Sequence, residues 1–417
     1  MIKIGIDSFE NYKPIDNCVD FRFDKHDDWN EFPCHTGFVI QWFTNNKNLY
    51  QYVDTKLEDN FIYPINFKCF INGLGISITD VWEKDISELK PKRTFLDSIP
   101  DHILEKVRNN KAKILLNYGF EGYPKEKRDT ILYLESILID KLKEKHIPID
   151  NVYYTDANYN LDGLELDIKT FSHNYTANCF YTSEGEVGSN IDHFKLSDNQ
   201  IEKKKKTELT KKYICYNRLK KWHRERVVNW IKENGYLEDG YVSFPPDLIL
   251  DYTNFCDNWA YHKICTDHFD TSFFSIINES NYGYQECFLT EKTWKAIFNF
   301  HPFIIVGSPN SLKYLKERGF DIFEDIFDSS YDDIYDGTER LQRIFDILDD
   351  FLKTNSILEL QKIREDMFSR LLYNYNHFWG DFRKYVTNDF FKKVSDSEST
   401  KLLIDKFNII EKGNIND

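Results

Sequence analysis

The sequence predicts a two-domain α/β protein whose second domain is a doubly wound, Rossmann-like sheet. The chain has 417 residues, and a single hydrophobic core seldom grows to that length. Segments typical of strands alternate with segments typical of helices in both halves, which favours parallel sheets covered by helices. A polar, lysine-rich segment at 201–212 separates the two patterned regions. We therefore expect a first domain at 1–205, a second at 206–380 and a helical tail at 381–417.

The clearest unit of the first half is a strand, a helix and a second strand. Residues 112–118 form an apolar run, residues 125–145 carry apolar side chains at helical spacing, and residues 151–156 form another strand-like segment. This order predicts two parallel neighbouring strands joined by a crossover helix. The N-terminal segment and residues 37–43 and 70–78 also have strand character.

The second half alternates more regularly. The expected strands are 213–217, 241–244, 272–280 and 303–307, with a possible edge strand at 320–323. The expected helices are 224–234, 290–300 and 308–319, the last with Ser308 as its N-cap and Gly319 beyond its end. Residues 339–393 are expected to be helical and to pack back on the first domain. In such a domain, ligands bind at the carboxyl ends of the strands.

Composition narrows the class of protein. Hydrophobic residues make up 41% of the chain and charged residues 29%, as in a globular protein. The net charge of −15 makes nucleic acid an unlikely general partner, although lysines and arginines gather between 203 and 226. Eight scattered cysteines without zinc spacing predict reduced thiols. The N-terminus lacks a signal peptide and no apolar run is long enough to span a membrane, so we expect a cytoplasmic protein.

The segment CFLTEKTW, residues 287–294, carries the most chemical information. Thr290 is placed to cap a helix, and the free amides of a first helical turn attract anions. Lys292 would add positive charge, Glu291 could accept hydrogen bonds from sugar hydroxyls, and Phe288 could form a wall. A diphosphate fits this combination. Such a triplet more often belongs to a plain capped helix. The neighbouring segments must therefore indicate whether it also binds a ligand.

Those surroundings point to a ligand site. The helix follows a strand that ends in the polar triplet Asn278, Glu279 and Ser280, and it precedes the apolar strand 303–307. Loops in these positions lie at the carboxyl edge of an open α/β sheet.

These motifs resemble the α-1,3-fucosyltransferase family. That family has a strand ending in a Glu-Asn-Ser-type motif, then Tyr-Val-Thr-Glu-Lys, a helix and an apolar strand ending in Gly-Ser/Ala-Pro. The corresponding text here is FFSIINES, then CFLTEKTWKAIFNFHPFIIVGSP, in the same order. A further strand followed by an arginine that opens a helix resembles YICYNRLKKWHRERVVNWI. The likeness covers about 213–320. It differs in the order Asn278-Glu279, in a longer gap before Thr290, and in Phe288, which lacks the tyrosine hydroxyl.

The resemblance implies an inverting glycosyltransferase with two Rossmann-like domains that face a cleft, an architecture called GT-B. It also implies a nucleotide-diphosphate sugar, such as guanosine diphosphate–fucose, as donor and no bound metal or other cofactor. Arg224, or alternatively Arg226, matches the family's phosphate-binding arginine. Phe288, Glu291 and Lys292 match the positions of the second motif.

An inverting transfer also needs a base to deprotonate the acceptor hydroxyl, which we expect to belong to a glycan. Glu121 is the leading candidate, because its loop follows the strand 112–118 and is flanked by glycines. Asp80, Glu83 and Asp156 are weaker alternatives. Two other functions stay open: a non-catalytic protein that binds nucleotide sugars, and a glycosyltransferase that modifies nucleic acid.

Three other side chains have structural interpretations. Trp294 is expected in the core, because it shares a helical face with apolar neighbours. His223 is expected to be exposed, and His301 is expected to end a helix before a proline.

Overall fold

The structure is a computed structural model and contains two compact units. Unit 1 comprises Met1–Asn178, Glu186–Ser189 and Tyr385–Asp417, and unit 2 comprises Cys179–Gly185 and Asn190–Lys384. The residues that the structure describes are 2–6, 50–67, 85–90, 94–118, 128–156, 167–172, 177, 195–248, 266–283 and 287–386. The predicted strands 37–43 and 70–78 lie outside this set, as do Glu121, Asp80 and Glu83.

Unit 1 is built on a six-stranded sheet in the order β2-β1-β3-β4-β5-β6, and all its paired strands are parallel. The strands are β1 (Ile2–Ile6), β2 (Tyr50–Asp54), β3 (Phe61–Phe67), β4 (Ala112–Tyr118), β5 (Val152–Asp156) and β6 (Lys169–Ser172). Strand β2 is added on one side of β1 and strands β3 to β6 on the other, so the sheet is doubly wound with its reversal between β1 and β3.

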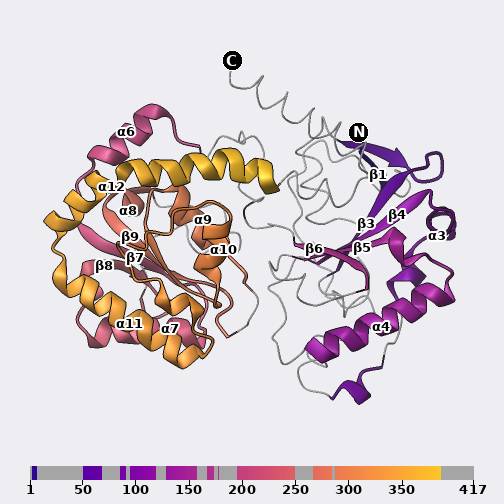
Figure 1. Cartoon of the computed structure of the whole chain (residues 1–417), viewed down its shortest axis with the longest axis horizontal. Helices are drawn as coiled ribbons and strands as arrows, with labels where there is room; N and C mark the ends of the chain where they lie inside the picture. Colours follow the sequence, from indigo (N-terminus) through magenta and orange to yellow (C-terminus); the bar gives the residue numbers. More distant parts are fainter. Residues whose placement is uncertain are drawn as a thin grey trace. The chain divides into compact units, whose positions relative to one another are not determined.

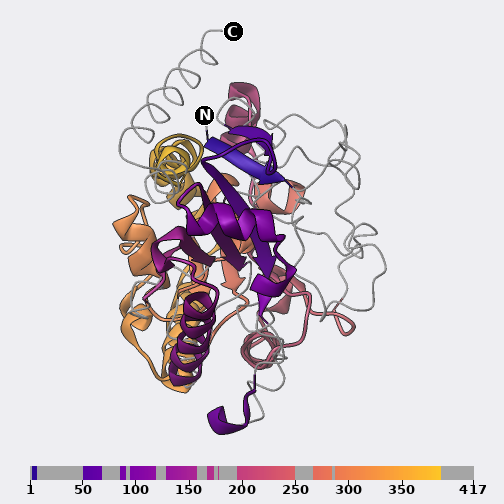
Figure 2. The same cartoon turned by 90° about the vertical axis from the view of Figure 1, so that its right-hand side faces the viewer.

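Helices cover one apolar face of this sheet. The helical segments are α3 (Asp101–Arg108), α4 (Arg128–Glu144) and the 3-10 turns η2 (Ile86–Glu88), η3 (Phe95–Ser98) and η5 (Ile149–Asn151). Side chains of α3 and α4, including Ile103 and Leu138, share one core with alternate residues of β3, β4 and β5, such as Ile114. The ribbon of these helices and strands is drawn in Figure 2. The predicted order of strand 112–118, helix and parallel strand is thereby confirmed.

Unit 2 is built on a four-stranded parallel sheet in the order β10-β9-β7-β8 (Figure 1). The strands are β7 (Lys211–Tyr216), β8 (Gly240–Ser243), β9 (Ser272–Asn278) and β10 (Phe303–Val306). Every residue of β9 and β10 is buried, as expected of parallel strands with both faces covered. The winding direction reverses between β7 and β9, so unit 2 is also doubly wound.

The helices of unit 2 lie around this sheet (Figure 1). They are α6 (Asp198–Lys206), α7 (Trp222–Glu233), α8 (Thr266–Asp270), α9 (Glu291–Phe298), α10 (Ser311–Glu317), α11 (Gly337–Thr354) and α12 (Ile357–His377). Short turns are η8 (Leu237–Asp239), η10 (Ser330–Asp333) and the π-helical η11 (Phe378–Phe382). Trp294 of α9 is fully buried against Phe378 and Phe382, so its predicted place in the core is confirmed.

Several local predictions are wrong. Helix α10 starts three residues later than expected, after Asn310 in a left-handed conformation with φ 63°, so Ser308 is not its N-cap. The segment 320–323 forms no strand and contains Phe323 with φ 59°. Helices α11 and α12 belong to unit 2, where α12 packs against α9, β7 and β9, and the segment from Tyr385 is grouped with unit 1. That the C-terminal helices pack back on the first domain stays a prediction.

The first part of the lysine-rich segment belongs to a helix, α6, and the predicted domain boundary after residue 205 falls inside this helix. Lys204 of α6 is 6% exposed and forms an ion pair with Asp270. Its ammonium also donates to Asn299 Oδ1 at 3.4 Å. Burial lowers the pKa of Lys204, against the opposing effect of Asp270. The buried pair therefore fixes α6 to the body of unit 2.

Asp270→Ala is expected to destabilise unit 2 strongly, because it leaves the buried Lys204 charge without its ion partner. We expect the free energy of unfolding to fall by about 3 kcal/mol in urea denaturation. Asp247→Ala is the matched control, since it removes an ion pair with Lys220 in which both side chains are about half exposed. The control should change stability by less than about 0.5 kcal/mol. Equal effects of the two variants would contradict the structural role given to Lys204.

Candidate functional site

The predicted donor-binding residues gather at the carboxyl edge of the sheet of unit 2. Strand β9 ends at Asn278 and is followed at once by Glu279 and Ser280, and β7 leads through a short turn into α7. The winding of the sheet reverses between these two strands. A crevice outside the strands at such a reversal is where ligands of open α/β sheets bind.

Glu279 joins three elements of this edge. Its amide donates to Val306 O at 3.0 Å. Its carboxylate accepts from Thr290 N at 3.0 Å and from Thr293 Oγ1 at 2.6 Å, and it also accepts from the Thr290 hydroxyl. Burial raises the pKa of Glu279, against the opposing effects of Lys292 and these hydrogen bonds. Glu279 is fully buried, so it positions the start of α9 and does not present its carboxylate to solvent.

Thr290 caps α9 as the sequence predicts. Its hydroxyl accepts from Lys292 N at 3.4 Å and from Lys292 Nζ at 2.9 Å. Lys292 Nζ also donates to Glu291 Oε1 at 3.0 Å, and the two side chains are 24% and 16% exposed. Burial tends to raise the pKa of Glu291, but Lys292 and Lys295 hold it below its usual value. The Thr-Glu-Lys triplet thus places two charged, partly exposed side chains at the start of α9.

Two residues of α7 donate hydrogen bonds to the backbone carbonyl of Glu279. Arg224 Nη2 donates to Glu279 O at 3.1 Å and Arg224 Nη1 donates to Leu219 O at 3.3 Å. His223 Nε2 donates to the same Glu279 carbonyl at 2.9 Å. Lys221, just before the helix, donates to Ser280 O at 2.8 Å. Lys221, Arg224 and Lys292, which we call the cation cluster, all act electrostatically on His223.

The two helices at this edge differ at their first turns. Helix α9 is capped by Thr290, whose amide is already bonded to the Glu279 carboxylate. Helix α7 has Lys221 at its N-cap, and the lysine side chain makes no capping hydrogen bond. A side chain that only donates cannot satisfy the amides of a first turn. The positive end of α7 therefore adds to the cation cluster.

Aromatic side chains support α7 at the same end. His223 stacks on Tyr282 with ring centroids 5.0 Å apart, and the Trp222 ring lies 5.9 Å from Tyr282. The guanidinium carbon of Arg340 is 4.4 Å from the Tyr282 ring centroid. The Tyr282 hydroxyl donates to Gly337 O at 2.6 Å. Tyr282 is thus held from both α7 and the start of α11.

A buried polar group lies at the ends of the two central strands. The side-chain amides of Asn217 and Asn278 donate to Cys215 Sγ at 3.5 and 3.3 Å. Both asparagines are at most 3% exposed, and within the described residues their Oδ1 atoms have no hydrogen-bond partner. Unpaired buried acceptors are costly, so they mark a place where a donor from water or a ligand would be stabilising.

The structure does not bring every predicted residue into this group. Arg226 is exposed on α7, two residues from the buried Arg224. Phe288 is 5% exposed and belongs to the core. Asp156 ends β5 in unit 1. The prediction that His223 is exposed is wrong: this residue is 4% exposed, because its ring packs on Tyr282.

Sequence reasoning missed four residues of the site, namely Lys221, Tyr282, Arg340 and Asn217. Lys221 stood within the recognised basic stretch, so its position just before the helix was the available signal. Tyr282 and Arg340 are far apart in the chain, and no spacing rule connects them. His301 is also buried, and it bonds Ser275 Oγ at 2.9 Å and Phe269 O at 2.8 Å at the opposite end of β9.

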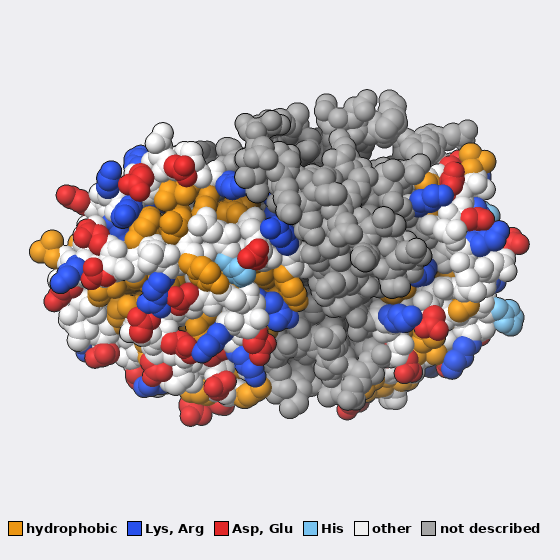
Figure 3. Space-filling view, turned by 45° about the horizontal axis from the view of Figure 1, so that its top comes forward, with side chains coloured by type: hydrophobic (Ala, Val, Ile, Leu, Met, Phe, Trp, Pro, Cys, Tyr) orange, Lys and Arg blue, Asp and Glu red, His pale blue; other side chains and the backbone are white. Residues whose placement is uncertain are grey.

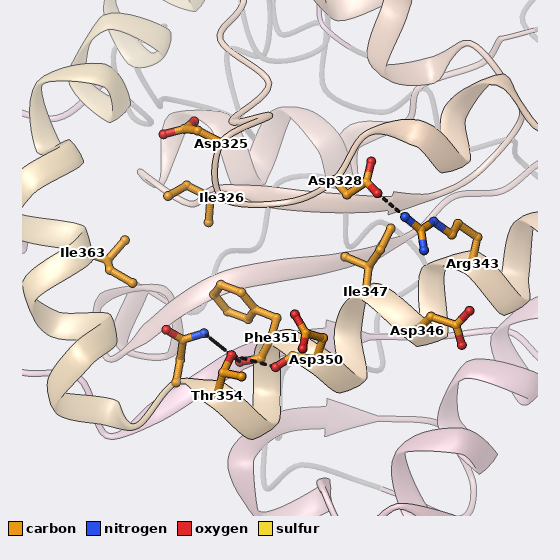
Figure 4. A pocket seen from close by; sticks show the side chains of 11 residues that line it. Asp325, Ile326, Asp328, Arg343, Asp346, Ile347, Asp350, Phe351, Thr354 and Ile363 are labelled. Atoms are coloured by element: carbon orange, nitrogen blue, oxygen red, sulfur yellow. Dashed lines mark hydrogen bonds and ion pairs between the residues drawn. The ribbon is translucent and has the colours of Figure 1, made fainter.

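A separate hollow of about 470 Å³ lies elsewhere in unit 2, between α11, the start of α12 and the loop before η10 (Figure 4). Its charged lining comprises Asp325, Asp328, Arg343, Asp346 and Asp350. It contains none of the predicted site residues. Asp328 pairs with Arg343 across one side of it. An acidic lining disfavours a diphosphate, so the cation cluster stays the candidate site.

The surface of the described residues carries charges of both signs. On the face drawn in Figure 3, acidic and basic side chains of the described residues are interspersed. The two described cysteines, Cys215 and Cys287, are buried free thiols, as the sequence predicts. Among the helices that the structure describes, none combines the length and the apolar character needed to cross a membrane.

Comparison with known proteins leaves the site to be judged on its own geometry. Neither the family models, nor the curated proteins, nor the solved structures contain a match to this chain.

His223 is expected to make the stability of unit 2 sensitive to acid. Burial lowers its pKa to about 3, with Arg224, Lys221 and Lys292 acting in the same direction. An unfolded chain binds this proton near pH 6.5, so the unfolded state holds more protons between about pH 6.5 and 3. Stability due to this residue is therefore lost as the pH falls through that window.

His223→Gln is expected to reduce this sensitivity, because glutamine keeps an NH donor for Glu279 O but binds no proton. The slope of unfolding free energy against pH, measured from pH 5.5 to 4.5, should fall by about one proton, roughly 1.4 kcal/mol per pH unit. An unchanged slope would show that His223 is not buried as a neutral ring.

Proposed function

We propose that the chain is an inverting glycosyltransferase that transfers a sugar from a nucleotide-diphosphate donor to a hydroxyl of a glycan acceptor. One observation carries the proposal: three cations and an uncapped helix start converge at the winding reversal of a doubly wound sheet. Backbone amides and fixed cations at such a place are suited to phosphate groups.

The cation cluster would stabilise the diphosphate as it leaves the sugar. Breaking the bond between the sugar and the phosphate leaves a growing negative charge on the diphosphate oxygens. Lys221, Arg224 and Lys292 would stabilise that charge without moving, because hydrogen bonds to Ser280, Glu279 and Thr290 already orient them. Such pre-oriented charge is an effective source of rate acceleration. A reaction without a bound metal or other cofactor stays a prediction.

The acceptor groups near the cations suit the hydroxyls of the donor. Glu291 keeps a low pKa through Lys292 and Lys295, although its burial acts the other way, so its carboxylate is available to accept from a ribose or sugar hydroxyl. The side-chain oxygens of Asn217 and Asn278 add neutral acceptors at the strand ends. Glu279 has a positioning role in this proposal, because its carboxylate is committed to Thr290 and Thr293.

The architecture of the proposed enzyme follows the family resemblance. Fucosyltransferases of this type have two Rossmann-like domains, and both units of this chain contain a doubly wound parallel sheet. We propose that unit 2 holds the donor and that unit 1 supplies the acceptor side with Glu121 as base. Guanosine diphosphate–fucose is the donor that the resemblance favours.

Lys292→Ala is expected to weaken binding of the donor nucleotide. Removing one charge-assisted contact to a diphosphate should lower affinity about 10- to 100-fold. The measurement is calorimetric titration with the nucleotide that gives the largest thermal shift among guanosine, uridine, cytidine and thymidine diphosphates and their sugars. Arg224→Lys should weaken binding as well, because lysine lacks the planar fork of donors.

Arg226→Ala is the matched control for these variants, since it removes an exposed arginine from the same helix. It should bind the nucleotide as the wild-type chain does. If Arg226→Ala lost affinity while Arg224→Lys and Lys292→Ala kept it, the cation cluster would not be the donor site.

Glu121→Gln separates an enzyme from a protein that only binds nucleotide sugars. Loss of a general base should reduce sugar transfer by roughly 10²- to 10⁴-fold and leave nucleotide affinity unchanged. Release of the nucleoside diphosphate from the donor sugar, with a panel of saccharide acceptors, is the measurement. Asp156→Asn serves as the comparison, and a loss confined to that variant would move the base to β5. Binding of the donor without turnover in the wild-type chain would favour the non-catalytic alternative.

A further inference from the structure

Trp222 is unusual among the described tryptophans of unit 2. It is 54% exposed, whereas Trp294 is fully buried and Trp379 is 6% exposed. The structure describes one more tryptophan, Trp230, which is partly buried and stacks on Phe345. Large apolar rings are usually covered in a folded domain. An exposed indole beside a charged site therefore calls for a ligand that can use its ring.

The position of Trp222 couples it to the cation cluster. It is the first residue of α7, so it directly follows Lys221 and lies within the same helical turn as Arg224. The turn that leads to it starts at Asn217, whose side chain is 3% exposed and whose Oδ1 has no partner within the described residues. Cations, a hydrogen-bond acceptor and an aromatic ring are thus brought together by one strand-to-helix connection.

The indole also contacts a second aromatic ring, that of Tyr282. Its ring lies 5.9 Å from Tyr282 at an interplanar angle of 49°. Tyr282 is itself stacked with His223 and covered by Arg340, and its hydroxyl is bonded to Gly337 O. A ring held by such neighbours loses little conformational entropy when a ligand stacks on it. The contact with Tyr282 distinguishes Trp222 from an exposed side chain that has no neighbouring ring.

We propose that the Trp222 indole is the platform on which the nucleobase of the donor nucleotide stacks. The inference rests on the proposed function and adds the base subsite to it. A nucleoside diphosphate carries a flat aromatic ring linked through ribose to two phosphates, so its site needs an aromatic face near fixed cations. Stacking tolerates any base, because every base presents a π face. Trp222 would therefore contribute affinity for the nucleoside, whereas the cation cluster would bind the diphosphate.

The experiment compares two probes on the full-length chain: guanosine diphosphate and inorganic pyrophosphate, with uridine diphosphate run in parallel. Trp222→Ala is expected to weaken binding of the nucleoside diphosphates about tenfold, the effect of losing one stacked base. Its affinity for pyrophosphate should stay within about twofold of wild type. Trp222→Phe, which keeps an aromatic face, should retain most of the nucleotide affinity.

A second measurement covers the case in which Trp222→Ala fails to fold. Guanosine diphosphate should quench tryptophan emission of the wild-type chain, and the quenching should be absent in Trp222→Phe, whereas pyrophosphate should quench neither. Nucleotide affinity that is unchanged in Trp222→Ala, or an equal loss for pyrophosphate, would overturn the base platform. Absence of binding of any nucleoside diphosphate to the wild-type chain would instead overturn the proposed function, so the two failures are distinguishable.

Discussion

The buried contact between Glu279 and the start of α9 is the constraint on which the site depends. A carboxylate taken out of water needs several donors, and the structure provides them from Thr290 and Thr293. Because the same residue bonds Val306 through its amide and α7 through its carbonyl, one position connects β9, β10 and two helices. Gly307 lies against it: a Cβ at that position would be 3.3 Å from the Glu279 Cβ. The carboxyl edge of the sheet is therefore packed around Glu279.

This packing changes which parts of the edge can bind an anion. The sequence points to the amides of α9, but the Glu279 carboxylate already occupies part of that first turn. A diphosphate placed on the same amides would meet a carboxylate, and two anions at short range repel each other. At the start of α7, Lys221 stands at the N-cap without a capping hydrogen bond, and the acidic residue of the first turn, Glu225, is exposed. Lys292 extends toward Thr290 and Glu291 and supplies positive charge from the α9 side. The electrostatics thus favour a diphosphate between the two helices, closer to α7.

Much of this arrangement can be predicted from the sequence, for identifiable reasons. The buried runs of β4, β9 and β10 and the cap at Thr290 depend on local chemistry, and they appear where the pattern places them. The start of α10 was missed because Asn310 takes a left-handed conformation that a Ser-Pro start signal does not reveal. The burial of Lys204 was missed because its partner, Asp270, is distant in the chain. Pairings of this kind depend on tertiary contacts, which composition and periodicity do not encode.

The choice between Arg224 and Arg226 illustrates the same limit within a single helix. Both residues follow the motif, and a spacing of two places them on roughly opposite sides of α7. Which side faces the sheet is decided by Val227, Val228 and Ile231, which are fully buried. Arg224 lies with this buried face and reaches Glu279 O, so it can orient a charge toward the strand ends. A carbonyl oxygen holds a guanidinium in place without cancelling its charge, and for this reason a buried arginine at the strand ends is better suited to an anionic ligand than an exposed one that salt would screen.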